Sequence, residues 1–229
     1  MEEQQVIDHF NKQVQDYTGL MTRLIPEYTS GQNFICKMIP FNKDAPIKVL
    51  DLGTGTGGLA ELVLKSYPLA KVHAFDLTHE MLVMCQERLE EYKDRLTFQQ
   101  GDFKCDSIGT GYDVVLAGLT LHHLTHIERK EFFKKLYDSL NDGGAFLSRD
   151  VIVDDDASIA ELHYSHWRNF MFGQGEDGSA WYKKHLQKDH PVTIGDQLVW
   201  LNSAGFVQPA CHWRYWNFAI FGGRRQETT

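Results

Sequence analysis

The sequence predicts an α/β protein with a doubly wound, mostly parallel seven-stranded sheet. Three observations support this prediction. Short apolar runs alternate with segments of helical spacing from residue 47 to residue 153, a rhythm typical of right-handed βαβ units. The run at 112–117 is apolar without alternation, as buried parallel strands are. Two further apolar runs near the C-terminus indicate a closing antiparallel pair of strands.

The stretch 48–60, KVLDLGTGTGGLA, is the feature around which the other elements are arranged. It predicts a buried strand, a turn whose backbone approaches a ligand, and a helix whose N-terminus faces that ligand. Glycine at the turn removes the Cβ atoms that would hold a ligand away, and it permits positive φ angles. An ordinary glycine-rich turn is the simpler interpretation. The strand before it and the helix after it favour a nucleotide-type site.

The remaining elements of this region follow from local signals. Thr78 is a candidate N-cap for a helix, and Thr125 with Glu128 forms a capping-box pair that opens a helix to about Leu140. Residues 141–144, Asn-Asp-Gly-Gly, indicate a turn. The predicted strands are 47–52, 71–75, 96–99, 112–117 and 145–148, and the first helix is predicted at 57–66.

The flanking segments predict covers for the sheet. Apolar residues at 6–17 and 34–39 have helical spacing. In residues 154–191 the alternation of predicted strands and helices stops, and the segment is rich in His, Trp, Tyr and Phe. This indicates an inserted helical lid over the C-terminal edge of the sheet. A helix at 193–204 stops at Gly205, before closing strands. The single predicted domain thus has covering helices at 1–46, a cofactor-binding core at 47–153, a lid at 154–191, and a last helix with closing strands at 192–229.

Composition narrows the class of protein and of partner. The 229 residues suffice for one large domain. The formal net charge is −8 and the basic clusters are short and scattered, so a nucleic acid is disfavoured and a small-molecule partner is expected. The four cysteines show no CxxC spacing, and no apolar leader or membrane span is visible. We therefore expect a soluble, cytoplasmic protein, with a homodimer as a candidate assembly.

Two nucleotide cofactors fit the glycine turn. Residues 53–58 also satisfy GxGxxG, the signature of nicotinamide dinucleotide sites. Asp76, which ends the second strand, suits a ribose diol in either case. Asp51 directly before the turn suits the amino group of a ligand and suits a pyrophosphate poorly. Asp102, after the third strand, can accept a hydrogen bond from an adenine amino group.

These residues resemble successive motifs of class I S-adenosylmethionine-dependent methyltransferases. The motifs are the turn and its strand at 49–57, Asp76, Gly-Asp at 101–102, and Tyr-Asp-Val-Val-Leu at 112–116. Residues 120–124, Thr-Leu-His-His-Leu, are similar to those of small-molecule members. The resemblance implies a Rossmann-like fold, S-adenosyl-L-methionine as cofactor, S-adenosyl-L-homocysteine as product, and in-line transfer of the methyl group to a small molecule.

The resemblance also implies contacts by position. Asp51 faces the amino group of the cofactor, Asp76 holds the ribose, and Asp102 holds the adenine amino group. Phe103 is a candidate to stack on the adenine, unless it belongs to the core. The implied cofactor-binding set is Tyr28, Asp51, Gly53, Thr54, Gly55, Gly57, Asp76, Leu77, Asp102, Phe103, Ala117 and Gly118, with the last two passing beneath the sulfonium.

A second likeness supplies a different candidate function. Residues 24–28, Leu-Ile-Pro-Glu-Tyr, and 215–218, Tyr-Trp-Asn-Phe, resemble stretches of carboxy-S-adenosylmethionine synthases, which serve tRNA wobble-uridine modification. This likeness implies that Tyr28 reaches a carboxylate on the cofactor. Ala-Gly at 117–118 stands where that group has an asparagine, and Tyr-Lys-Lys-His at 182–185 stands where its cover has an arginine. The glycine turn is also compatible with a non-catalytic cofactor-binding module and with a dehydrogenase.

Candidate catalytic residues follow the fourth and fifth strands. Methyl transfer requires alignment of the nucleophile and, for an oxygen or nitrogen acceptor, removal of its proton. His122 and His123 are candidates for the base or for orienting the acceptor, and capping or solvation is the structural alternative. Asp150, at the end of the fifth strand, can accept a hydrogen bond from the substrate or from Arg149.

A metal site in the lid is not predicted. Glu161, His163 and His166 have ligand chemistry, but on a helix Glu161 lies about 200° around from His163. No fourth ligand has suitable spacing.

Overall fold

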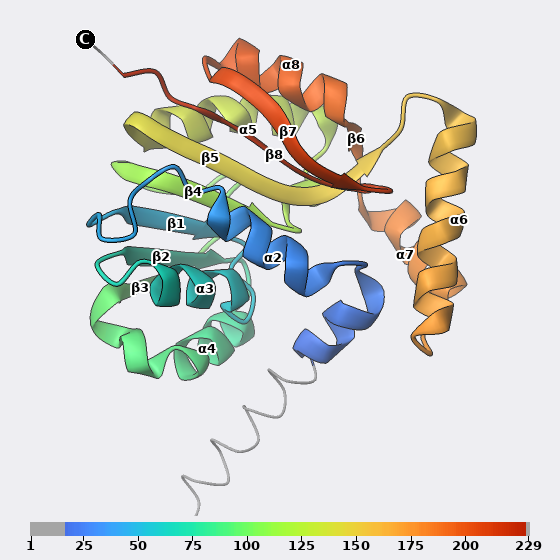
Figure 1. Ribbon diagram of the computed structural model, residues 1–229, viewed down its shortest axis with the longest axis horizontal. Helices are drawn as coiled ribbons and strands as arrows, with labels where there is room; N and C mark the ends of the chain where they lie inside the picture. The colour runs from blue at the N-terminus through green and yellow to red at the C-terminus, as the bar shows by residue number, and fades with distance from the viewer. Residues whose placement is uncertain (1–16, 228–229) are drawn as a thin grey trace, which may run out of the picture.

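The computed structural model describes residues 17–227 and confirms the predicted fold. Within that range, seven strands form one sheet in the order β3-β2-β1-β4-β5-β8-β7 (Figure 1). A two-residue strand, β6 (Val192–Thr193), pairs with the far end of β5 outside this order. The seven strands are β1 (Lys48–Leu52), β2 (Lys71–Asp76), β3 (Leu96–Gln100), β4 (Tyr112–Gly118), β5 (Leu140–Val153), β7 (Val207–Tyr215) and β8 (Phe218–Arg224).

The strand order creates a switch point beside β1. β1 pairs in parallel with β2 on one side and with β4 on the other. The chain runs outward through β2 and β3, then returns to β4 and continues outward through β5. The loops that leave β1 and β4 therefore diverge at the C-terminal edge, where doubly wound sheets bind ligands. β8 runs antiparallel to β5 and β7, which confirms the predicted closing pair.

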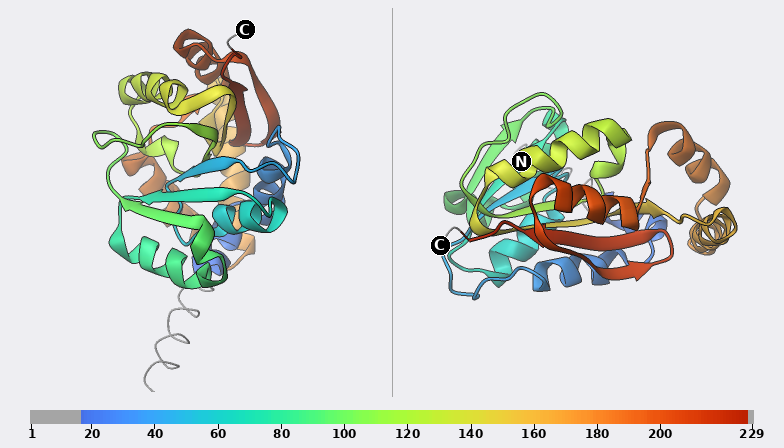
Figure 2. Two further views of the ribbon diagram at one scale, coloured as in Figure 1. Left: turned by 90° about the vertical axis from the view of Figure 1, so that its left-hand side faces the viewer. Right: turned by 90° about the horizontal axis from the view of Figure 1, so that it is seen from above.

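Helices cover both faces of the sheet (Figure 2). Side chains of α2, α3 and α4 pack with Val49, Val72 and Val114 on one face. Side chains of α5 and α8 pack with Leu50 and Val115 on the other, because successive strand residues point to opposite faces. These helices are α2 (Tyr28–Lys37), α3 (Gly58–Ser66), α4 (His79–Arg88), α5 (His126–Ser139) and α8 (Ile194–Ala204).

A third apolar cluster lies beyond the end of β5. The helices α6 (Ala157–Gly173) and α7 (Gly178–Lys188) stand beside this end of the sheet (Figure 1). They pack against the helical segment 17–24 through Leu24, Tyr164 and Trp167. The Trp167 indole donates a hydrogen bond to the Leu24 carbonyl at 2.7 Å. The expectation of helices within 154–191 is thus confirmed.

One local prediction is wrong, and another is confirmed in position only. The predicted turn at 141–144 is wrong: β5 begins at Leu140 and includes these residues. Leu140 pairs with Tyr112 and Ala145 with Val114, so the extra residues form an irregularity inside the strand. Thr78 is the N-cap residue of α4, as predicted, but its side chain makes no capping bond. Its hydroxyl and N–H both donate to Asp76.

One further local prediction is confirmed, and another lies almost wholly outside the described residues. The capping box of Thr125 and Glu128 is present at the start of α5. The predicted helical spacing at 6–17 lies, except for Tyr17, outside the described residues.

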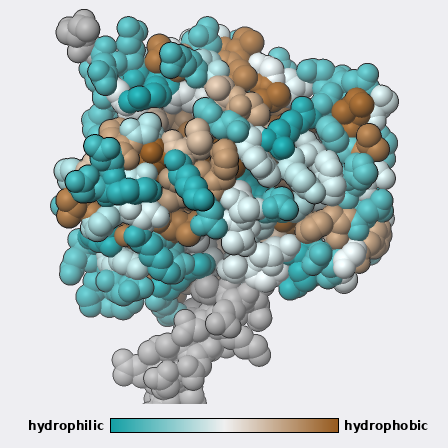
Figure 3. Space-filling view, viewed as in Figure 1, coloured by the Kyte–Doolittle hydropathy of each residue, from teal (hydrophilic) through white to brown (hydrophobic). Residues whose placement is uncertain are grey.

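Hydrophilic residues cover most of the face in Figure 3, and hydrophobic residues occur there in separate patches. None of the helices described between residues 17 and 227 combines the length and apolar character that a bilayer crossing needs.

Candidate functional site

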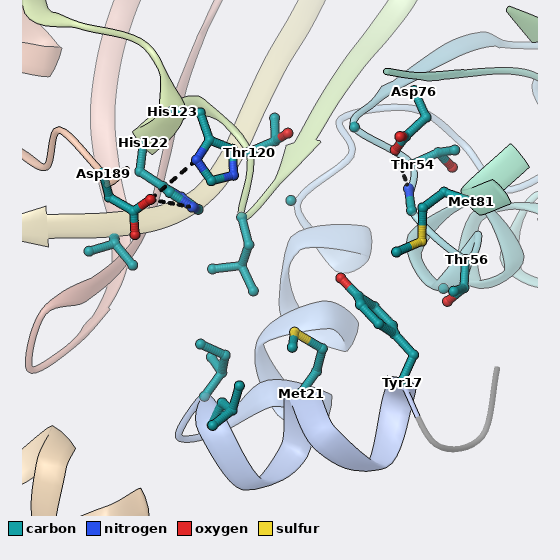
Figure 4. Close-up of a pocket in the computed structure, with 18 of the residues that line it drawn as sticks. Tyr17, Met21, Thr54, Thr56, Asp76, Met81, Thr120, His122, His123 and Asp189 are labelled. Carbon is teal, nitrogen blue, oxygen red and sulfur yellow. Dashed lines mark hydrogen bonds and ion pairs between the residues drawn. The ribbon is translucent and has the colours of Figure 1, made fainter. Parts of the chain in front are cut away.

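A cavity of about 610 Å³ opens at the C-terminal edge of the sheet, beside the switch point. Its volume falls in the range that small-molecule sites occupy. Figure 4 shows two groups of polar side chains facing each other across it. The glycine-loop end carries the turn after β1 together with Asp76 and Asp102, and the histidine end carries His122 and His123. The helical segment 17–24 supplies Tyr17 and Met21 between them.

The three glycines with positive φ in the loop have different surroundings. Gly53 has φ +63°, and a Cβ there would lie 2.1 Å from the Thr120 hydroxyl oxygen. Gly55 has φ +54°, and a Cβ there would meet no atom within 4 Å. Gly57 has φ +80°, and its added Cβ would lie 2.6 Å from the sulfur of Cys85 on α4. Close packing therefore requires Gly53 and Gly57, whereas Gly55 presents bare backbone to open space.

Asp76 joins the end of β2 to the glycine loop. One carboxylate oxygen accepts a hydrogen bond from the Gly55 N–H at 2.9 Å. The other accepts from the N–H and the hydroxyl of Thr78, both at 3.0 Å. The side chain is thus fixed before any ligand binds, and carboxylate oxygens retain further acceptor positions for a diol. Asp102 is held similarly, since it accepts from the Lys104 N–H at 2.9 Å.

Asp51 is buried beneath the loop. Burial raises the pKa of its carboxyl to about 7, and the negative charge of Asp76 contributes in the same direction. The hydroxyl of Thr54 donates to the carboxylate at 2.7 Å and opposes the shift. A buried carboxyl of this kind gains its charge most easily beside a cationic group. Asp51 therefore suits the ammonium group of a ligand.

At the histidine end, His122 is buried against Asp150. The Nδ1 atom of His122 lies 2.5 Å from an oxygen of Asp150, which also accepts the Val151 N–H at 2.8 Å. Burial disfavours the charge on Asp150, but His122 and Arg129 outweigh it and lower the pKa of Asp150. Burial likewise opposes a charge on the imidazole, yet Asp150 outweighs it and raises the pKa of His122. With Nδ1 fixed by a carboxylate, Nε2 is the ring atom free for chemistry.

A second carboxylate completes this end of the cavity. Asp189, which follows α7, places one oxygen 3.2 Å from His123 Nδ1 and 3.9 Å from His122 Nε2. Its other oxygen lies 2.7 Å from Nδ1 of His185. Burial raises the pKa of Asp189, but the hydrogen bonds from His123 and His185 outweigh it, and the pKa stays well below its usual range.

A family model described as a methyltransferase domain matches residues 49–144. Residues 49–144 therefore belong to a class I S-adenosylmethionine-dependent methyltransferase domain. This assignment covers the glycine loop, Asp76, Asp102 and the loop with both histidines.

Curated relatives of this chain include proteins of two kinds. A carboxy-S-adenosyl-L-methionine synthase from Campylobacter fetus is 24% identical over 208 residues, which are 90% of this chain and 88% of that protein. A malonyl-[acyl-carrier protein] O-methyltransferase from Priestia megaterium is 29% identical over 146 residues, 62% of this chain and 50% of that protein.

Solved structures share the fold. Human N-acetylserotonin methyltransferase in complex with SAM matches with a TM-score of 0.62 and 18% identity over 87% of this chain. A putative O-methyltransferase from Nostoc punctiforme matches with a TM-score of 0.65 and 17% identity, also over 87% of this chain. This chain spans 52% of the human protein and 57% of the Nostoc punctiforme protein.

The fold brings most of the predicted site residues to one cavity. Gly57 and Ala117 lie outside the cavity lining: Gly57 packs on α4, and Ala117 is buried between β1 and β5. Asp150 lies behind His122 and also outside the lining. The predicted residues that line the cavity are Tyr28, Asp51, Gly53, Thr54, Gly55, Asp76, Leu77, Asp102, Phe103, Gly118, His122 and His123.

Phe103 contacts both the cavity and the apolar core. It lines the cavity, and its ring packs on Phe132 of α5 with the centroids 5.0 Å apart. The residues weighed for a metal site in the lid are not brought together. Glu161 pairs with Arg168, and His166 stacks on Trp216.

Sequence reasoning missed two buried arginines that shape the cavity. The Arg149 guanidinium donates to the carbonyls of residues 26, 27 and 28 and so fixes the backbone that carries Tyr28. The Arg129 guanidinium donates to the carbonyls of Leu121, Leu124 and His190. It thereby ties the chain beside Asp189 to the loop that carries both histidines. Neither arginine stands in a pattern from which this contact could be inferred.

Proposed function

We propose that this protein transfers the methyl group of S-adenosylmethionine to an oxygen or nitrogen atom of a small molecule and releases S-adenosylhomocysteine. One observation carries the proposal: a single cavity joins the acid-lined glycine loop to a buried His122–Asp150 pair. Apolar side chains from three helical segments, including Leu24, Trp167 and Trp181, line the same space. A small acceptor with an apolar body suits such a lining.

At the glycine-loop end, each acid has a proposed partner on the cofactor. Asp51 binds the amino group, Asp76 the ribose hydroxyls, and Asp102 the adenine amino group. Gly53 and Gly55 let the backbone approach the methionine part. Of these contacts, the one at Asp76 is the most preorganised, because three donors already hold the carboxylate in place.

At the histidine end, His122 is the proposed base. The acceptor atom attacks the methyl carbon in line with the carbon–sulfur bond, and that bond breaks as the new one forms. The sulfonium becomes a neutral thioether, and Nε2 of His122 takes the proton that the acceptor loses. Asp150 does not touch the acceptor in this scheme. It positions the ring and stabilises the imidazolium that forms. His123, at the mouth of the cavity, orients the acceptor.

Calorimetric titration of the full chain tests the proposal. S-adenosylmethionine and S-adenosylhomocysteine are expected to bind, and NADH is not. Binding of NADH alone would overturn the proposal in favour of a dehydrogenase.

A second candidate function is synthesis of a carboxymethyl sulfonium cofactor. It is favoured by relatives named as carboxy-S-adenosyl-L-methionine synthases, whose likeness extends over 90% of the chain. Tyr28, the residue implied to reach the extra carboxylate, lines the cavity, as does Lys184 from the segment where those synthases carry arginine. Mass spectrometry of the ligand that co-purifies with the protein separates the two. A carboxymethyl sulfonium would favour the synthase, and S-adenosylmethionine or its demethylated product would favour methyl transfer.

A further inference from the structure

Three potential metal ligands meet at the histidine end of the cavity. His122, His123 and Asp189 each offer one ligand atom, and the three atoms lie within 4.8 Å of one another. The separations from the Asp189 oxygen are 3.2 Å to Nδ1 of His123 and 3.9 Å to Nε2 of His122. Two ligands of one ion, each about 2.0–2.2 Å from it, lie about 3–3.5 Å apart. Small rotations of the side chains would bring all three within coordination distance.

In two of these side chains, His122 and Asp189, the second ligand atom is already engaged, as in established metal sites. Asp150 contacts Nδ1 of His122 at 2.5 Å, which directs the other ring nitrogen into the cavity. His185 holds the far oxygen of Asp189 at 2.7 Å. Carboxylate–histidine–metal arrangements use this outer contact to fix the tautomer and the orientation of the ligand.

A simple ion pair explains only part of this geometry. His123 and Asp189 are within hydrogen-bond distance, but His122 Nε2 at 3.9 Å is too far for one. Nevertheless this buried nitrogen faces the same oxygen. Arg129 maintains the approach, because its guanidinium joins the carbonyls of Leu121 and His190, which lie next to the ligands in sequence.

We propose that His122, His123 and Asp189 bind a divalent transition-metal ion. Two imidazoles and one carboxylate favour Zn²⁺ or Co²⁺ over Mg²⁺ and Ca²⁺, which prefer all-oxygen sites. The His123 side chain is 55% exposed and gives the ion a route from solvent. Three protein ligands beside a cavity leave at least one coordination position for water or an acceptor atom.

Metal binding has one consequence for the reaction, and this consequence rests on the proposed function. A nitrogen lone pair cannot bind an ion and accept a proton at once. The metal-bound protein therefore has no free base at His122. Zn²⁺ is expected to inhibit methyl transfer to an acceptor atom that must lose a proton.

Co²⁺ and Zn²⁺ titrations of the chelator-treated full chain test the site. Visible absorption should report one bound Co²⁺ per chain, which Zn²⁺ displaces and millimolar Mg²⁺ does not. His123→Ala, at an exposed position, and Asp189→Asn, of the same shape, should each weaken Co²⁺ binding at least tenfold. His126→Ala is the matched control, because His126 is an exposed histidine on α5 outside the cluster. It should bind Co²⁺ like the unmodified chain.

The outcomes separate this inference from the proposed function. Absence of stoichiometric Co²⁺ binding, or equal binding by the unmodified chain and both cluster variants, overturns the metal site. Circular dichroism and S-adenosylmethionine titration of the same samples establish whether each variant is folded. A chain that binds the cofactor and no metal contradicts the metal site alone. A chain that binds Co²⁺ and no cofactor supports the metal site and contradicts the proposed function.

Discussion

The affinity for S-adenosylmethionine should change with pH, because Asp51 is proposed to bind the amino group in its charged form. The pKa of its carboxyl in the free protein is about 7. About one tenth of the carboxyls are then ionised at pH 6 and about nine tenths at pH 8. If only the ionised form binds, the apparent affinity at pH 6 is lower by roughly tenfold, or about 1.4 kcal/mol.

The amino group of S-adenosylmethionine limits the pH range over which the affinity rises. An α-amino group has a pKa of about 8 and loses its charge above that value. The affinity should therefore be greatest between about pH 7 and 8. Two controls isolate Asp51 from the ligand. Asp51→Asn should bind more weakly and lose the dependence below pH 7. Methylthioadenosine, which lacks the amino acid part of the cofactor, should bind the unmodified chain with little dependence on pH.

Isothermal titration calorimetry at several pH values, in buffers of different ionisation enthalpy, gives both the affinity and the protons released. Near pH 6.5, binding to the unmodified chain should release most of one proton, and Asp51→Asn should release none. An affinity that stays level between pH 6 and 8 would refute the assignment of Asp51 to the amino group. The same slope in Asp51→Asn would refute it as well.

Further predictions concern Asp76, His122, the glycine loop and the stability of the fold. Asp76→Ala should weaken S-adenosylmethionine binding by about 1.5–3 kcal/mol, the scale of hydrogen bonds to a charged group; unchanged affinity in calorimetry would contradict the ribose assignment. His122→Ala should lower kcat by about 10²–10⁴-fold with cofactor affinity nearly constant, and full turnover would exclude it as the base. In urea unfolding, Gly53→Ala should cost at least about 2 kcal/mol more than Gly55→Ala, because both have positive φ but only the first meets a neighbouring atom. The folded state holds the proton of Asp51 up to about pH 7 and the unfolded state only to about pH 4. Stability should thus fall by up to about 4 kcal/mol as pH rises through that window, and Asp51→Asn should lack this decline.

The sequence determined the elements that depend on neighbouring residues. Apolar runs and their spacing predicted the strands in their chain order, and the acids Asp51, Asp76 and Asp102 stand at or just beyond strand ends that a parallel sheet must bring to one edge. The start of β5 was not predicted correctly from the sequence. Its irregularity at 141–144 depends on pairing with β4 across the sheet, which the turn-like composition of those residues does not reveal.

Only the tertiary structure decided how the histidine end is built. Asp189 follows a helix of the cover, and no periodicity relates it to His122 or His123. Its place depends on how α7 packs and on the Arg129 guanidinium, which joins carbonyls from both segments. Arg149 acts in the same way on the backbone that carries Tyr28. Such contacts join elements far apart in the chain through single buried side chains. They therefore leave no local pattern in the sequence, whereas the glycine loop is specified by its own residues.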